Sequence, residues 1–403
     1  MKKNNDLILK ICLGLIVIIV VVISVITLYA PFDKNTESEK ENRVLAKMPT
    51  ISVKKITSGE FVGQFEQFLN DHVMMRSDII DVASDFEKLL KKDLDIKLTT
   101  GNGARKDIGS DALILEDRIL ALYIGNNEYT KALIDSSCKI FNTIPDGIDK
   151  YMVMSPSRVE FETEYCKQFT DSQKDEIEEI YASMPKDVKL IDSYKYMEYS
   201  VQTNPLDDIY FRTDHHWTAL GASYAANAIL EAMGKQMVYP INYELIEMGE
   251  FAGYLVAMHE DSINEDMPFD TFNYYSVSEN ITERAYGVEG AGIDEYIDGL
   301  LVDSERAGYY TFVERSYQYV VINGGQPGGG KLMMINDSYG NALVPWLAEQ
   351  YETIIMIDPR IYAGGKEKFL SLIEEYDIDS FMINLTGLVT SGAFGNNMAD
   401  VIK

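Results

Sequence analysis

The segment TDHHWT, from Thr213 to Thr218, brings an aspartate and two adjacent histidines together in a chain that has only four histidines. A carboxylate hydrogen-bonded to one imidazole nitrogen fixes the tautomer of the ring and stabilises its protonated form. In an extended segment, residues i and i+2 point to the same side. We therefore expect Asp214 and His216 to share one face, with His215 on the other, which predicts His216 as a catalytic base.

Two other interpretations of this segment remain open. A metal site would need a third or fourth ligand, and only His72 and His259 remain outside the motif, so we expect no metal. A purely structural Asp–His–Trp corner is the second alternative, because the segment by itself contains no nucleophile.

A second motif, KLMMINDSYGNALVPW, supplies the missing nucleophile. It predicts a buried strand, a tight Asn-Asp-Ser turn and a helix. Ser338 would lie at the helix N-terminus, where free backbone N–H groups can bind a developing oxyanion. An isolated serine at such a junction can be only a helix cap, but with Asp214 and His216 it completes a nucleophile, base and orienting acid. The order Asp, His, Ser along the chain is no obstacle.

The elements around these motifs alternate between apolar strands and amphipathic helices. This alternation predicts an α/β fold with a mainly parallel sheet that is covered on both faces. Thr218 is expected to cap a helix that ends before Gly234. The strands are expected at 151–156, 188–193, 331–336, 352–358 and 379–385, and the helices at 126–144, 170–184, 218–234, 341–350 and 366–376.

The pattern fails between about residues 241 and 320, which are rich in Tyr, Gly and acidic residues. Short stretches of alternation there predict antiparallel strands and long loops, an insertion of the kind that shapes a substrate cleft over an α/β core. Tyrosine-rich surfaces can stack on sugar rings, but Tyr is also an ordinary strand residue. Both interpretations stay open.

The N-terminus predicts a membrane anchor. An uncharged apolar run from Ile11 to Ala30 is long enough to span a bilayer, and three lysines precede it, which places the N-terminus in the cytoplasm. We expect a cytoplasmic tail at 1–6, an anchor at 7–30, an extracytoplasmic stalk and helical region at 31–110, and a catalytic domain at 111–403. Outside the cell, Cys138 and Cys166 could pair or remain separate thiols.

Composition narrows the class of protein. A hydrophobic content of 46% and a charged content of 25% are typical of a globular protein with a proper core. The formal net charge of −28 argues against a nucleic-acid partner, because phosphate binding needs a surplus of Lys and Arg.

Three stretches together resemble the DHHW protein family of Gram-positive bacteria: TDHHWT, NDSYGNALVPWLAEQYETIIMIDPR, and the earlier ENRVLAKMP with FEQFLNDHVMMR. That family is similar to the alginate O-acetyltransferases of the SGNH-hydrolase-like superfamily. The resemblance implies a three-layer α/β domain and carries the triad roles to Asp214, His216 and Ser338. Asn336 replaces the glycine that precedes Asp-Ser in those acetyltransferases.

The resemblance implies a membrane-anchored extracytoplasmic O-acyltransferase that acetylates a cell-surface or exported polysaccharide through an acyl-enzyme. No cofactor is expected, since a membrane-bound O-acyltransferase partner would supply the acyl group. A carbohydrate esterase with the same triad and a non-catalytic glycan-binding scaffold subunit remain alternatives. Four further residues are candidates for oxyanion stabilisation or substrate binding: Arg360, Tyr339, Asn384 and His215. A surface salt bridge is the alternative for Arg360, and a strand-end cap for Asn384.

Overall fold

The computed structural model describes residues 111–263, 266–313 and 317–403, together with 37–38, 43–44, 50, 55, 61, 64, 68 and 97–99. The chain divides into two compact units, Met1–Asp95 and Ile96–Lys403. In the first unit, β1 (Glu37–Ser38) pairs with β2 (Arg43–Val44). No helix among the described residues is long and apolar enough to cross a membrane. The predicted anchor and most of the predicted stalk and helical region lie outside the described residues.

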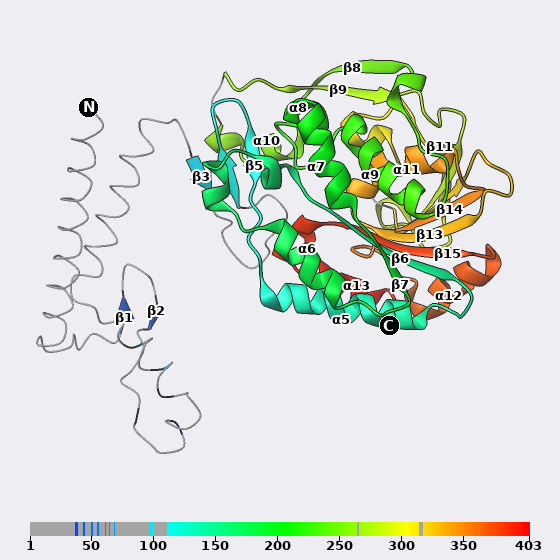
Figure 1. The fold of residues 1–403 in the computed structure, drawn as a ribbon, viewed down its shortest axis with the longest axis horizontal. Helices are drawn as coiled ribbons and strands as arrows, with labels where there is room; N and C mark the ends of the chain where they lie inside the picture. Colours follow the sequence, from blue (N-terminus) through cyan, green and yellow to red (C-terminus); the bar gives the residue numbers. More distant parts are fainter. Residues whose placement is uncertain are drawn as a thin grey trace, which may run out of the picture. The chain divides into compact units, whose positions relative to one another are not determined.

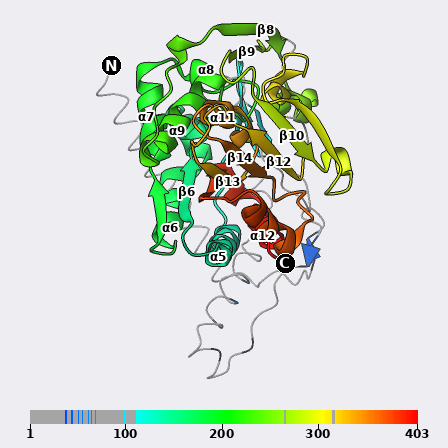
Figure 2. The ribbon, with the colours of Figure 1, turned by 90° about the vertical axis from the view of Figure 1, so that its right-hand side faces the viewer.

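The second unit is a mixed α/β fold around one eight-stranded sheet (Figures 1 and 2), with the strand order β11-β10-β12-β14-β13-β15-β6-β7. Five strands of this sheet run parallel: β6 (Asp149–Ser155), β7 (Val188–Ile191), β13 (Lys331–Asn336), β14 (Thr353–Ile357) and β15 (Ser380–Thr386). All five are strands that the hydrophobic pattern predicts.

The other side of the sheet adds antiparallel strands to the five parallel ones. Three strands there pair antiparallel, so the sheet is mixed: β10 (Thr282–Tyr286), β11 (Tyr296–Leu300) and β12 (Tyr319–Asn323). The first two belong to the predicted insertion, which also contains the antiparallel pair β8 (Leu245–Phe251) and β9 (Asp270–Tyr275). The insertion therefore extends the sheet instead of only lying over it.

Helices cover both faces of the sheet, because its buried strands present apolar side chains to both sides. Along β13, Leu332 and Met334 join one core cluster, whereas Met333 and Ile335 join the other. The first face carries α7 (Ser193–Thr203), α9 (Ala219–Ala232) and α11 (Tyr339–Ala348). The second carries α5 (Asn127–Thr143), α6 (Gln173–Ala182), α12 (Gly365–Glu375) and α13 (Phe394–Asp400), seen below the sheet in Figure 1.

Local signals place most of these helices correctly. Thr218 caps α9, its side-chain oxygen accepting the Gly221 N–H at 3.1 Å, and Gly234 follows the helix with φ of 67°. Helix α6 is capped by Ser172, two residues after the start of the predicted helical segment. Smaller elements complete the unit: β3 (Lys97–Thr99), β4 (Ala112–Ile114) and β5 (Ile119–Ala121) form an antiparallel sheet, and α8 (Leu206–Ile209) and α10 (Tyr254–Met258) are short helices.

Candidate active site

The structure brings the three residues of the two motifs together at the carboxyl end of β13. The Oδ1 atom of Asp214 lies 2.6 Å from Nδ1 of His216, and Nε2 of His216 lies 2.7 Å from Oγ of Ser338. Asp214 and His216 are 4% and 7% exposed. Both distances are those of short hydrogen bonds, so the serine hydroxyl can donate its proton to the imidazole.

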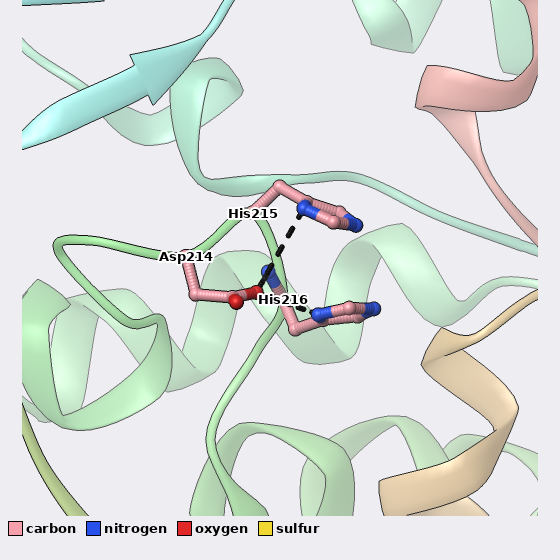
Figure 3. Close-up of side chains that lie close together, drawn as sticks. All are labelled: Asp214, His215 and His216. Atoms are coloured by element: carbon pink, nitrogen blue, oxygen red, sulfur yellow. Dashed lines mark hydrogen bonds and ion pairs between the residues drawn. The ribbon is translucent and has the colours of Figure 1, made fainter. Parts of the chain in front are cut away.

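The expected reason for choosing His216 over His215 is wrong, because residues 212–216 form a series of bends and not an extended segment. The two imidazoles consequently lie together, with ring centroids 4.0 Å apart (Figure 3). Each turns its Nδ1 toward Asp214, but that of His215 remains 3.8 Å from Oδ1. The structure therefore distinguishes the two histidines by their distances and not by opposite faces.

The carboxylate of Asp214 is held in its ionised form. Burial by itself would raise its pKa, but His216, His215 and the Tyr254 N–H outweigh burial and lower the pKa below its usual range. The Oδ2 atom accepts the Tyr254 N–H at 2.7 Å, and Oδ1 also accepts the His216 N–H at 2.9 Å. Three donors thus converge on one buried carboxylate, which fixes its orientation toward the imidazole.

His215 is kept neutral. Burial lowers its pKa to about 3, and the neighbouring His216 adds to the effect. Its Nδ1 has no hydrogen-bond partner among the described residues. A neutral ring beside His216 adds no second charge when His216 takes up a proton.

The loop that carries both histidines is anchored by buried side chains that the sequence did not single out. Arg158 donates to the carbonyl oxygens of Tyr210 and Phe211, at 3.0 and 3.3 Å. Asp270, on β9 of the insertion, accepts the backbone N–H groups of Arg212 and Thr213, both at 2.9 Å. No local sequence pattern links these residues to the loop, since Asp270 is 57 or more positions away.

The insertion also closes directly onto Asp214. A side chain at Gly253 would meet the Cβ of Asp214 and the carbonyl oxygen of Thr213 at 2.4 Å each. Only glycine allows this approach, which brings the Tyr254 N–H to the carboxylate.

Ser338 occupies the N-cap position of α11, as predicted. The next three backbone N–H groups are engaged within the turn: Tyr339 donates to Oδ1 of Asp337, Gly340 to the Asp337 carbonyl and Asn341 to the Ser338 carbonyl. The general expectation that helix N–H groups receive an oxyanion must therefore be narrowed. Within the described residues, the N–H of Ser338 is bonded to no other group of this turn.

Asp337 ties the nucleophile turn to the neighbouring strand. Its Oδ2 accepts the N–H of Thr386, the last residue of β15, at 2.7 Å. Burial raises the pKa of Asp337 to about 6, against the opposing effects of the Thr386 N–H, Arg360 and the Tyr339 N–H. The serine is therefore held by two strands and a helix.

Tyr339 is part of the wall of the site. It is 1% exposed, its hydroxyl donates to the His215 carbonyl, and its own carbonyl accepts the Trp217 indole N–H at 3.1 Å. These bonds join the helix of the serine to the loop of the histidines.

Arg360 and Asn384 lie at this end of the sheet in different settings. Arg360 forms a two-point ion pair with Asp358, at 2.9 Å from Nε and 2.6 Å from Nη2, and its side chain is 40% exposed. Asn384 is 1% exposed and pairs in register with Asn336 on the adjacent strand. Neither amide atom of Asn384 has a partner among the described residues.

Asp214, His215 and His216 are also the group that could hold a cation, because one ligand atom from each lies within 4.8 Å of the others. A metal bound there would compete with the bonds that Asp214 and Ser338 make to His216. The thiols of Cys138 and Cys166 are free and take no part in the site.

The comparisons with known proteins agree with this architecture. The model of the DHHW protein family matches residues 150–357, which is over half of the chain and includes both motifs. The chain belongs to the DHHW protein family. Among curated proteins no match was found.

Solved structures show the same fold. A DHHW family protein from Eubacterium siraeum has a TM-score of 0.62 and 23% identity over 75% of this chain and 99% of its own. PatB1 from Bacillus cereus, with a sulfonyl adduct, has a TM-score of 0.57 and 18% identity over 71% of this chain and 97% of its own. The O-acetyltransferase domain of Pseudomonas putida AlgJ has a TM-score of 0.38, at 14% identity, over 66% of this chain and 86% of its own. A score that low does not establish a common fold.

Proposed function

We propose that this DHHW protein is an O-acyltransferase that moves an acetyl group to a polysaccharide hydroxyl through an acyl-serine on Ser338. The observation that carries the proposal is the unbroken chain of contacts from Asp214 through His216 to Ser338, at 2.6 and 2.7 Å. The SGNH-like catalytic domain, the membrane anchor at 7–30 and the extracellular location are further parts of this proposal.

The first half of the reaction loads the serine. Nε2 of His216 takes the proton from Ser338 as Oγ attacks the acyl carbonyl, and Asp214 stabilises the imidazolium through Nδ1. The N–H of Ser338 donates to the oxyanion, with Arg360 as a second candidate donor. As the carbon–leaving-group bond breaks, His216 returns the proton to the leaving group.

The second half transfers the acyl group. A sugar hydroxyl enters, His216 removes its proton, and the oxygen attacks the acyl-serine carbonyl. The bond to Oγ breaks and Ser338 recovers its proton from His216. His215 and Arg360 are the candidates for contacting this acceptor. Tyr339 and Asn384 are buried, so we assign them to holding the site in shape.

The acyl donor would come from a membrane-bound O-acyltransferase partner, because acetyl-CoA is cytoplasmic and the proposed active site faces outward. The chain's own residues supply no redox or metal chemistry in this scheme, and no cofactor enters it. Water in place of the sugar would make the protein an esterase with the same triad.

The test uses the full chain in detergent with an activated acetyl ester and a sulfonyl fluoride. The sulfonyl probe is chosen because the similarly folded PatB1 carries a sulfonyl adduct. We expect acetate release and one adduct on Ser338, with Ser338→Ala losing about 10⁴-fold in turnover and the adduct altogether. Ser371→Ala, on α12, is the matched control.

The outcome for Ser338→Ala decides the proposal. Turnover and labelling equal to wild type in this variant would refute the acyl-serine, and an unlabelled wild-type protein would favour a scaffold. Acetyl transfer to an oligosaccharide, measured beside acetate release, separates a transferase from an esterase.

A further inference from the structure

The imidazole of His216 lies between two other rings. Tyr309, in the insertion, stacks on it with a centroid distance of 3.9 Å and an interplanar angle of 16°. His215 lies 4.0 Å away at 35°. Two rings this close cannot share one face of an imidazole without overlapping, and within the described residues no ring contact joins Tyr309 to His215. They therefore cover opposite faces.

We propose that Tyr309 is a positioning residue for the base, which makes the insertion part of the catalytic apparatus. This inference rests on the proposed function, because it assigns Tyr309 a role in the proton transfer from Ser338. Tyr309 acts through the imidazole that it covers.

Two physical effects support this role. A ring on each face, stacked for Tyr309 and tilted for His215, restrains rotation of the imidazole about its Cβ–Cγ bond, and such a rotation would break both the Asp214 and the Ser338 contacts. In addition, the face of a tyrosine ring attracts a cation, so it stabilises the imidazolium that forms when Ser338 gives up its proton. The two effects favour the same step.

Tyr309 adds an uncharged ring to the charged groups around His216, of which Asp214 is in direct contact with the imidazole. Three elements face His216. Its own loop contributes Asp214 and neutral His215, and the insertion contributes Tyr309. Helix α11 and the turn before it contribute Tyr339 and Asp337, and Arg360 lies near Asp337. Burial raises the pKa of the Tyr309 and Tyr339 hydroxyls well above the usual value, so both stay uncharged. Replacing Tyr309 with an apolar residue therefore changes no formal charge.

The structure also separates the ring of Tyr309 from its hydroxyl. The hydroxyl is buried beside the backbone of Ala342 and the indole of Trp217, and it forms no hydrogen bond to Asp214, His216 or Ser338. Tyr309→Phe keeps the stacked ring and should behave as wild type, whereas Tyr309→Leu removes the ring. The neighbouring Tyr310 is 45% exposed, and Tyr310→Leu is the matched control.

The experiment measures the rate at which a sulfonyl fluoride labels Ser338 in the full chain between pH 5 and 9. For Tyr309→Leu we expect a loss of about 5- to 30-fold in the plateau rate, the size that a cation–π contact supports. The acid limb of the profile should move down by about 0.5 to 1.5 pH units, because the protonated base loses a stabilising contact. Tyr309→Phe and Tyr310→Leu should retain the wild-type profile.

A wild-type profile for Tyr309→Leu would overturn the inference while leaving the acyl-serine intact. A loss of rate with an unmoved acid limb would refute stabilisation of the imidazolium and leave only the restraint on its rotation. Thermal unfolding of each variant identifies damage to the fold directly. Absence of labelling in the wild-type protein refutes the proposed function itself, so the two failures are distinguishable.

Discussion

Asp214→Asn is the substitution that most directly tests whether the carboxylate acts on the base or only holds the loop. Asparagine has the same shape, but it replaces one acceptor oxygen with a donor. In wild type, Oδ1 faces two His216 donors and Oδ2 faces the Tyr254 N–H. An amide cannot satisfy all three, so either the base or the insertion loses its contact.

The asparagine amide can take two orientations, and one lowers folding stability whereas the other lowers turnover. With the amide oxygen toward His216, the Tyr254 N–H is left facing a donor at a site that is 4% exposed, which costs about 1–3 kcal/mol of folding free energy. With the NH₂ group toward His216, the imidazole must carry its proton on Nε2 and cannot accept one from Ser338. Losing both the negative charge at position 214 and the correct tautomer of His216 should lower turnover by about 10⁴-fold, or about 5.5 kcal/mol in activation free energy.

The assay compares turnover of an activated acetyl ester with the free energy of unfolding in denaturant. Asp270→Asn is the matched control, because Asp270 is also a buried carboxylate that accepts two backbone N–H groups of the same loop, yet it has no bond to His216. We expect similar losses of stability in the two variants, with the loss of turnover far larger in Asp214→Asn. Equal losses of turnover would refute the reasoning, since they would mean that Asp214 serves only to shape the loop.

Three further outcomes are expected. His216→Ala should lose about 10³-fold or more in turnover, whereas His215→Ala should retain far more activity; the reverse ranking in a steady-state assay would assign the base to His215. Because burial lowers the pKa of His215 to about 3, the unfolded chain takes up a proton near pH 6.5 and the folded chain does not. His215 should therefore reduce stability by about 2 kcal/mol as pH falls from 6.5 to 5, and denaturant unfolding of His215→Gln should lack that part of the slope. Trp217→Phe should lower the free energy of unfolding by about 1–3 kcal/mol, because the carbonyl of Tyr339 loses its indole donor; an unchanged denaturation midpoint would contradict this.

Much of the fold follows from local pattern. The apolar runs of β13, β14 and β15 and the capping residue Thr218 carry their own signals, so the parallel half of the sheet and helix α9 could be predicted. The antiparallel half could not, because pairing of β10 with β12 depends on register between distant segments and not on local periodicity.

The candidate site likewise contains residues that the sequence could predict and residues that it could not. Asp214, His216 and Ser338 stand in two compact motifs, and their chemistry made them recognisable before their contact was known. Tyr309 and Asp270 gave no such signal, since a single Tyr or Asp in an insertion rich in both is unremarkable until the chain is folded. The close contact between the His215 and His216 rings could not be predicted, because a bent backbone does not alternate its side chains as a strand does.

The close approach of Gly253 to Asp214 has a consequence for redesign of the insertion. Loops around an α/β core are usually free to be exchanged between relatives. This insertion, however, supplies the Tyr254 N–H to Asp214 and the Tyr309 ring to His216. Grafting a foreign loop here to change acceptor preference would disturb the proton relay at the same time. Engineering of new specificities should therefore leave residues 253–254 and 309 untouched and vary the solvent-facing turns between them.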